Sequence, residues 1–189
     1  MKIVCFGDSN TYGYDPRSYF GDRYSQENRW VNILADRLQC CVINEGENGR
    51  EIPHNKWQMT AFEQILASEK DLDLLIVMLG TNDLLQDHSA VAVAARMEEF
   101  LHNINLRQDQ ILLMAPPILQ LGEWVPSKHL VNESRILNER YRVIAKELKL
   151  GFVDTAEWHI PIEFDGVHFT QEGHRVLADR LAYYLRKGA

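Results

Sequence analysis

The feature that most constrains the fold is LLIVML at residues 74–79, a run near the middle of the chain in which every residue is apolar. A strand with one face in water alternates between apolar and polar residues, and this run does not alternate. Continuous apolar strands are typical of parallel sheets that helices cover on both faces. The run therefore predicts a central strand that is buried on both sides.

Four other apolar runs of strand length occur, at residues 3–6, 41–43, 111–115 and 152–153. Segments with apolar residues spaced three and four apart alternate with the strands, which predicts helices with one buried face. These segments are residues 30–38, 62–66, 93–104, 136–148 and 176–185. Five strands alternating with five helices predict a three-layer α/β/α fold with a five-stranded parallel sheet. The length of 189 residues suits one domain over residues 1–189.

The charge balance argues against a nucleic-acid partner. The chain has 20 basic and 27 acidic residues, a formal charge of −7 and a pI near 5.5. Nucleic acids and anionic membranes are bound by cationic surfaces. The apolar run at residues 3–6 is too short for a signal peptide, and no run is long enough to span a membrane. We therefore expect a cytoplasmic protein with no membrane span.

The cysteines do not predict disulfide bonds. Cys5, Cys40 and Cys41 are too few for a disulfide framework, and a bridge between the neighbours Cys40 and Cys41 is strained. We interpret all three as reduced thiols that form part of strands.

The longest irregular segments are residues 8–28, 115–127 and 154–170, and each follows a predicted strand. In open α/β sheets, ligands bind at the carboxyl ends of the strands. The polar, glycine and proline residues of this chain therefore gather where a binding site is expected.

Two polar segments follow the first two strands. GDSN at residues 7–10 allows a tight turn that exposes Ser9, and the alternative is a plain turn in which Asp8 and Ser9 cap the backbone. NEGENGR at residues 44–50 contains glycines, which let backbone N–H groups approach a ligand and stabilise an oxyanion. Alone, this second segment is equally well interpreted as a loop.

Two more polar segments follow later strands. GTND at residues 80–83 offers the amide of Asn82 as a fixed hydrogen-bond donor, or as the cap of the next helix. DGVHFT at residues 165–170 places Asp165 and His168 three residues apart. Such a carboxylate can hold one ring nitrogen and leave the other free as a base, although a lone histidine in a loop is more often solvated.

Taken together and in this order, FGDSN, NEGENG, MLGTND and DGVHFT resemble the motifs of GDSL-type esterases of the SGNH hydrolase superfamily. The resemblance covers essentially the whole chain. GDSNTYGY, the RW pair at residues 29–30 and DGVHFT are most similar to the branch of small arylesterases and acyltransferases. The resemblance implies a flavodoxin-like strand order of 2-1-3-4-5 and a serine esterase that hydrolyses small carboxylic esters, with acyl transfer to alcohols as a further reaction.

The resemblance also implies roles for single residues. Ser9 corresponds to the nucleophile, His168 to the general base and Asp165 to the residue that orients His168. The oxyanion hole corresponds to the backbone N–H groups of Ser9 and Gly49 and to the Asn82 amide, with Gly46 as a lesser alternative to Gly49.

The strand order makes this arrangement possible. Strands 2, 1 and 3 are neighbours about 4.8 Å apart, so the oxyanion donors lie side by side. The last strand is roughly 14 Å from the first, and residues 154–165 span at most about 36 Å when extended, so His168 can reach Ser9.

Other positions lie near the motifs and outside the triad and the oxyanion hole. Asn10 replaces the leucine of the motif, and we expect an effect on the pocket wall only. Arg50 occupies a position often filled in the arylesterase branch, without a role that the sequence reveals. Tyr12 and Trp124 are the aromatic residues we expect to bind substrate.

We expect a small-molecule ester as partner and no cofactor or metal. Members of the branch also form oligomers.

Two rival functions remain open. Asp8, Asn82, Asp83, Asp165 and His168 are ligand types for a divalent metal ion, as in a metal-dependent phosphoesterase, but no cluster of histidines accompanies them. The other rival is a non-catalytic carbohydrate- or lipid-binding module on the same fold. All the catalytic positions are filled, which argues against it.

Overall fold

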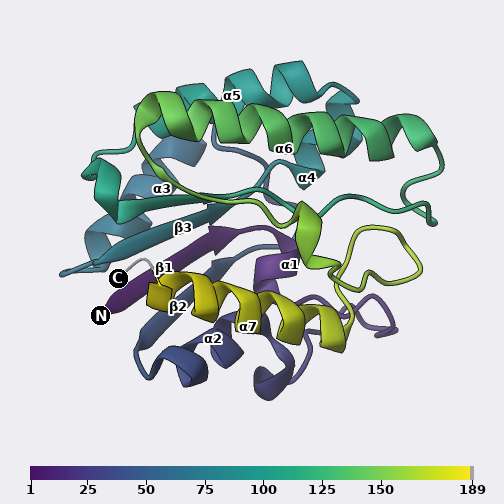
Figure 1. Ribbon diagram of the computed structural model, residues 1–189, viewed down its shortest axis with the longest axis horizontal. Helices are drawn as coiled ribbons and strands as arrows, with labels where there is room; N and C mark the ends of the chain where they lie inside the picture. Colours follow the sequence, from purple (N-terminus) through teal and green to yellow (C-terminus); the bar gives the residue numbers. More distant parts are fainter. Residues whose placement is uncertain (188–189) are drawn as a thin grey trace.

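A sheet of five parallel strands forms the centre of the computed structural model, which describes residues 1–187 (Figure 1). The strands are β1 (Lys2–Gly7), β2 (Cys41–Gly46), β3 (Leu74–Met78), β4 (Ile111–Met114) and β5 (Gly151–Val153). Their order across the sheet is β2-β1-β3-β4-β5, and every neighbouring pair is parallel. The predicted sheet and its predicted strand order are confirmed.

Helices cover both faces of the sheet, as predicted (Figure 1). Those on one face are α3 (Lys56–Ser68), α5 (Ala90–His102) and α6 (Lys128–Leu148), and those on the other are α2 (Trp30–Leu38) and α7 (Gln171–Lys187). The ends of α3 and α5 fit the capping rules, since the side chains of Asn55 and Ser89 accept hydrogen bonds from the first turns.

Two apolar clusters hold the three layers together. Because successive side chains of a strand point to opposite faces, Val4 and Phe6 of β1 pack on one side with Phe62. Ile3 and Cys5 pack on the other side with Trp30 and its neighbours. In β3 the side chains of residues 75–78 are all buried, which confirms the strand that the apolar run predicts.

Two short helices lie outside the predicted pattern. They are α1 (Ser9–Tyr12) and α4 (Thr81–Asp87), and they start close to the carboxyl ends of β1 and β3. The structure also contains 3-10 turns at Gln26–Asn28, Gln108–Gln110 and Ala156–Trp158.

The cysteines are free thiols, but one prediction about them is wrong. Cys5 lies in β1 and Cys41 in β2, whereas Cys40 lies in the turn before β2. The chain turns there because Gln39 ends α2 in the left-handed conformation, with φ of 53°. Within residues 1–187, no helix combines the length and apolar character needed to cross a membrane.

The register of the sheet brings the polar loops to one edge. Gly7 at the end of β1 is paired with Gly46 of β2 and with Met78 of β3. The segments that leave these three strands therefore start level with one another. The segments after β4 and β5 leave from the carboxyl ends of the same parallel sheet.

Candidate active site

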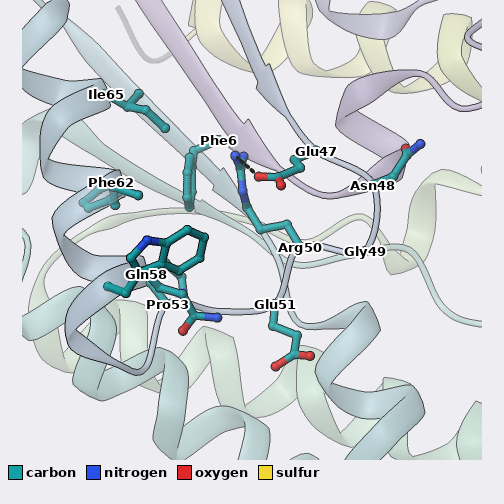
Figure 2. A pocket seen from close by; sticks show the side chains of 12 residues that line it. Phe6, Glu47, Asn48, Gly49, Arg50, Glu51, Pro53, Gln58, Phe62 and Ile65 are labelled. Atoms are coloured by element: carbon teal, nitrogen blue, oxygen red, sulfur yellow. Dashed lines mark hydrogen bonds and ion pairs between the residues drawn. The ribbon is translucent and has the colours of Figure 1, made fainter.

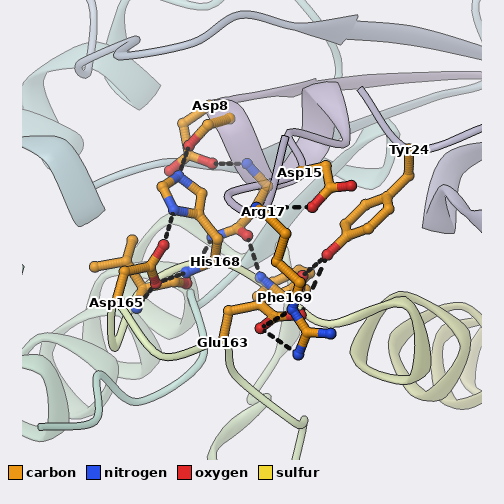
Figure 3. Close-up of polar contacts among 11 residues, drawn as sticks. Asp8, Asp15, Arg17, Tyr24, Glu163, Asp165, His168 and Phe169 are labelled. Carbon is orange, nitrogen blue, oxygen red and sulfur yellow. Dashed lines mark hydrogen bonds and ion pairs between the residues drawn. The ribbon is translucent and has the colours of Figure 1, made fainter. Parts of the chain in front are cut away.

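The Ser9 hydroxyl and the His168 imidazole meet at this edge, although 159 positions separate them in the sequence. Ser9 Oγ lies 2.9 Å from His168 Nε2, and His168 Nδ1 lies 2.7 Å from Oδ2 of Asp165 (Figure 3). The three residues are 7%, 2% and 1% exposed, respectively. A carboxylate can only accept, so Nδ1 carries the proton and Nε2 is left to accept from Ser9. The sequence-predicted triad residues are therefore brought together.

Asp165 is held as a carboxylate by donors on both oxygens. Its Oδ1 accepts from the backbone N–H groups of Val167 and His168, at 2.8 and 2.9 Å. Burial alone raises the pKa of Asp165, but the hydrogen bonds from the His168 ring and from these two N–H groups outweigh burial. The pKa of Asp165 is therefore below its ordinary value of 3.8, and the carboxylate persists through the neutral pH range.

The segment that carries Asp165 and His168 turns sharply at Gly166. Gly166 has φ of 84°, and a Cβ there would lie 2.2 Å from the carbonyl oxygen of Gln120. The backbone N–H groups of Gln120 and Trp124 donate to the carbonyls of Gly166 and Asp165, at 3.0 and 2.9 Å. The segment after β4 thus supports the segment that carries Asp165 and His168.

Ser9 begins α1, directly after a buried carboxyl. Oδ1 of Asp8 accepts from the Asn10 N–H at 2.9 Å and caps the helix. The helix packs closely on the end of β1, because a Cβ on Gly7 would lie 2.1 Å from the Thr11 hydroxyl oxygen. Burial raises the pKa of Asp8 to about 6, against the opposing effect of the Asn10 N–H bond.

The predicted oxyanion donors lie on two further loops. Gly49 is exposed, has φ of 74°, and has open space where a Cβ would stand. Asn82 lies in the first turn of α4, and its amide donates to the carbonyl of Arg50 at 3.0 Å. This bond ties the Asn82 side chain to the residue that follows Gly49.

Arg50 braces the loop that carries Gly49. Its guanidinium donates to the carbonyls of Gly7 and Glu45 and pairs with the Glu47 carboxylate at 2.7 Å. It also lies 4.2 Å from the centre of the Phe6 ring. Arg50 also lines a cavity of about 200 Å³ between the loop and α3, whose lining includes neither Ser9 nor His168. Figure 2 shows the side chains that line this cavity.

Aromatic rings flank the imidazole. The Tyr14 and Trp124 rings lie 4.7 and 5.1 Å from the His168 ring, and Trp124 is 49% exposed. The Tyr12 ring instead lies under the guanidinium of Arg23, at 4.0 Å. Trp124, which we expect to bind substrate, and Tyr14 therefore both lie beside the His168 ring.

Asn10 is placed differently from the expectation. It is 5% exposed, and its side-chain amide binds the backbone on both sides of His168 instead of forming a pocket wall. Only the polar residue in place of leucine in the motif could have signalled this role.

The carboxylates do not form a metal centre. Within residues 1–187, no group of three or more His, Cys, Asp or Glu side chains is arranged to hold a metal ion. Asp83 is already paired, since its carboxylate accepts from Arg96 at 2.6 Å and from the backbone N–H of Ile52. The phosphoesterase alternative is therefore not favoured.

A model of the GDSL-like lipase/acylhydrolase family matches residues 5–176. No curated protein matches the chain.

Several solved structures are similar over nearly the full length. An aryl esterase from M. smegmatis is 27% identical, with 98% of each chain covered and a TM-score of 0.82. A carbohydrate acetylesterase family member from Sinorhizobium meliloti is 28% identical, with 99% of this chain and 98% of that chain covered and a TM-score of 0.84. Another structure, of a carbohydrate acetylesterase from Sinorhizobium meliloti, is 25% identical, with 100% of this chain and 99% of that chain covered and a TM-score of 0.84.

Proposed function

Because the chain belongs to the GDSL-like lipase/acylhydrolase family and is a serine esterase, we propose that Ser9, His168 and Asp165 carry out its reaction. The observation that carries the proposal is the unbroken series of hydrogen bonds from Ser9 Oγ through the imidazole to Asp165. Ser9 is the nucleophile, His168 the general base, and Asp165 the carboxylate that fixes the tautomer and orientation of the ring.

The first half of the reaction forms an acyl-enzyme. Ser9 Oγ attacks the ester carbonyl carbon while its proton moves to Nε2 of His168. The tetrahedral intermediate collapses, the bond to the leaving oxygen breaks, and His168 returns the proton to the departing alcohol. In the second half, a water molecule gives a proton to His168 and attacks the acyl carbon, which releases the acid and restores Ser9. An alcohol in place of water would give acyl transfer.

The oxyanion of each tetrahedral intermediate requires donors. We assign them to the backbone N–H groups of Ser9 and Gly49 and to the Asn82 amide. The carbonyl of Arg50 takes one N–H of that amide, which leaves its second N–H for the oxyanion. The bond to Arg50 also fixes the amide in advance, and preorganised donors contribute most to stabilising the transition state.

The rings near His168 suggest the kind of ester. Trp124 and Tyr14 place aromatic rings beside His168, which suits a ring-shaped leaving group. The aryl esterase and carbohydrate acetylesterases among the similar structures support the same class, a short acyl group on an aromatic or sugar alcohol. A role for Tyr12 in binding substrate stays a prediction. Higher kcat/KM for p-nitrophenyl acetate than for the butyrate and palmitate would support the short acyl group.

The free thiols of Cys5, Cys40 and Cys41 suit a reducing compartment, and we propose the cytoplasm. Fractionation of cells that express the untagged protein would test this assignment.

Replacing Ser9 tests the nucleophile. We expect Ser9→Ala to lower kcat for p-nitrophenyl acetate by roughly 10⁴- to 10⁶-fold, as in other serine hydrolases. A fluorophosphonate, which a serine nucleophile attacks with loss of fluoride, should label the peptide that contains Ser9. Ser68→Ala, an exposed position on α3, serves as the control and should keep wild-type turnover. Unchanged turnover in folded Ser9→Ala protein would remove Ser9 from the mechanism.

A further inference from the structure

Asn10 joins the nucleophile's helix to the segment that carries the base. Its Nδ2 donates to the carbonyl of Val167 at 3.1 Å, and its Oδ1 accepts from the N–H of Phe169 at 3.0 Å. These two partners are the neighbours of His168 on either side. Within residues 1–187, α1 and residues 165–170 are joined by no other hydrogen bonds than these two and the Ser9–His168 contact.

Asn10 is itself held firmly. Its backbone carbonyl accepts from the indole N–H of Trp30 at 3.0 Å, and its N–H donates to Asp8. Trp30 is fully buried between the sheet and α7, and it therefore gives this contact a rigid support. The Asn10 side chain is thus a fixed bridge that begins one residue after Ser9.

An amide is suited to this place because it donates and accepts in one planar group. A leucine offers neither function, and it would leave the Val167 carbonyl and the Phe169 N–H without these partners. A buried polar group that loses its partner is costly, so the backbone around His168 would shift to find another. A carboxylate would still accept from Phe169 but would face the Val167 carbonyl without a proton to donate.

We propose that Asn10 is a positioning residue that sets the distance and angle between Ser9 Oγ and His168 Nε2. This inference rests on the proposed roles of Ser9 and His168. Asn10 touches no reacting atom and acts through the backbone of Val167 and Phe169. A displacement of about 1 Å between reacting groups lowers rates by roughly 100-fold, so loss of the bridge should slow acylation.

Asn10→Asp is the variant that changes the bridge with the least change of shape. Asn138→Asp is a matched control, because Asn138 is 3% exposed and its amide also donates to a backbone carbonyl, that of Pro116, at 3.1 Å. We expect Asn10→Asp to lower kcat and the rate of fluorophosphonate labelling by roughly 10- to 100-fold, with KM little changed. Asn138→Asp should lose thermal stability and keep both rates near wild type.

A measurement on the wild-type protein does not depend on whether either variant folds. The Phe169 N–H donates to Asn10, and its amide hydrogen should exchange as slowly as those of β1. Exchange at the rate of an unprotected amide would overturn the inference. Wild-type labelling rates in folded Asn10→Asp, or equal loss in Asn138→Asp, would also overturn it.

The outcomes separate this inference from the proposed function. Failure of the fluorophosphonate to label Ser9 in the wild-type protein would contradict the proposed function itself. Normal labelling of the wild type with equal labelling of Asn10→Asp would contradict the positioning role alone.

Discussion

Asp8 places a buried carboxyl next to Ser9, and Asp8→Asn tests what that burial does to stability. The variant keeps the oxygen that accepts from the Asn10 N–H at 2.9 Å and removes the titratable charge. Burial is the largest influence and raises the pKa of Asp8 from its ordinary 3.8 to about 6. Asp83 acts in the same direction, whereas the Asn10 N–H, His168 and Arg50 oppose it.

The sign follows from proton linkage. A carboxyl with a raised pKa in the folded state binds its proton more tightly when folded, so its contribution favours folding fully below pH 3.8 and is lost as the pH rises through about 6. One pKa unit corresponds to about 1.4 kcal/mol, so the full loss is about 3 kcal/mol by neutral pH. About 2 kcal/mol of this falls between pH 4.5 and pH 7.5, which is the range to measure.

Urea unfolding followed by circular dichroism gives the free energy of unfolding at both pH values. We expect the stability of Asp8→Asn relative to wild type to rise by about 2 kcal/mol from pH 4.5 to pH 7.5. Asp36→Asn, at an exposed position on α2, removes the same charge without burial and should show a much smaller change. If Asp8→Asn and wild type respond to pH in parallel, or if wild type gains relative to the variant, the reasoning from burial is refuted.

Two other substitutions test the site and the core. Asn82→Ala should lower kcat for p-nitrophenyl acetate by roughly 100- to 1,000-fold, as loss of an oxyanion donor does; steady-state kinetics with unchanged kcat would remove Asn82 from the oxyanion hole. Phe62→Ala should lower the free energy of unfolding by about 3–5 kcal/mol, because Phe62 is 2% exposed and its ring centre lies 4.9 Å from that of Phe6. A loss below about 1 kcal/mol in urea unfolding would show that this cluster is not tightly packed.

The sequence is most informative where a pattern is long. The apolar run at residues 74–79 predicts β3 because six residues without a polar side chain leave few alternatives. The short helices α1 and α4 could not be predicted in the same way. An apolar period needs several turns to become visible, and α1 has 4 residues. The start of α1 depends on the Asp8 cap and on the close packing that Gly7 allows. Both arise only once the end of β1 and the following turn have folded.

In the candidate site, too, some residues could be predicted from the sequence and others could not. The meeting of Ser9, Asp165 and His168 was predictable, because each lies in a recognisable motif and the strand order brings the motifs to one edge. The aromatic residues beside His168 were harder to predict, since Tyr12 and Tyr14 are two residues apart and cannot be told apart from the sequence pattern. The turn at Gly13 separates the two tyrosines, because Gly13 ends α1 with φ of 89°. After this turn the Tyr14 ring lies beside His168, whereas the Tyr12 ring lies under Arg23.

Around Ser9, several buried polar side chains bind the backbone of nearby segments. Asn10 binds the backbone on both sides of His168, and Asp165 binds the backbone of its own turn. Asp83 accepts from the N–H of Ile52, two residues after Arg50. Apolar packing alone is not directional, whereas hydrogen bonds fix distances and angles. Substitutions in these side chains should therefore alter the alignment of the reacting atoms more than the stability of the sheet. The reverse is expected for the aromatic core around Phe62.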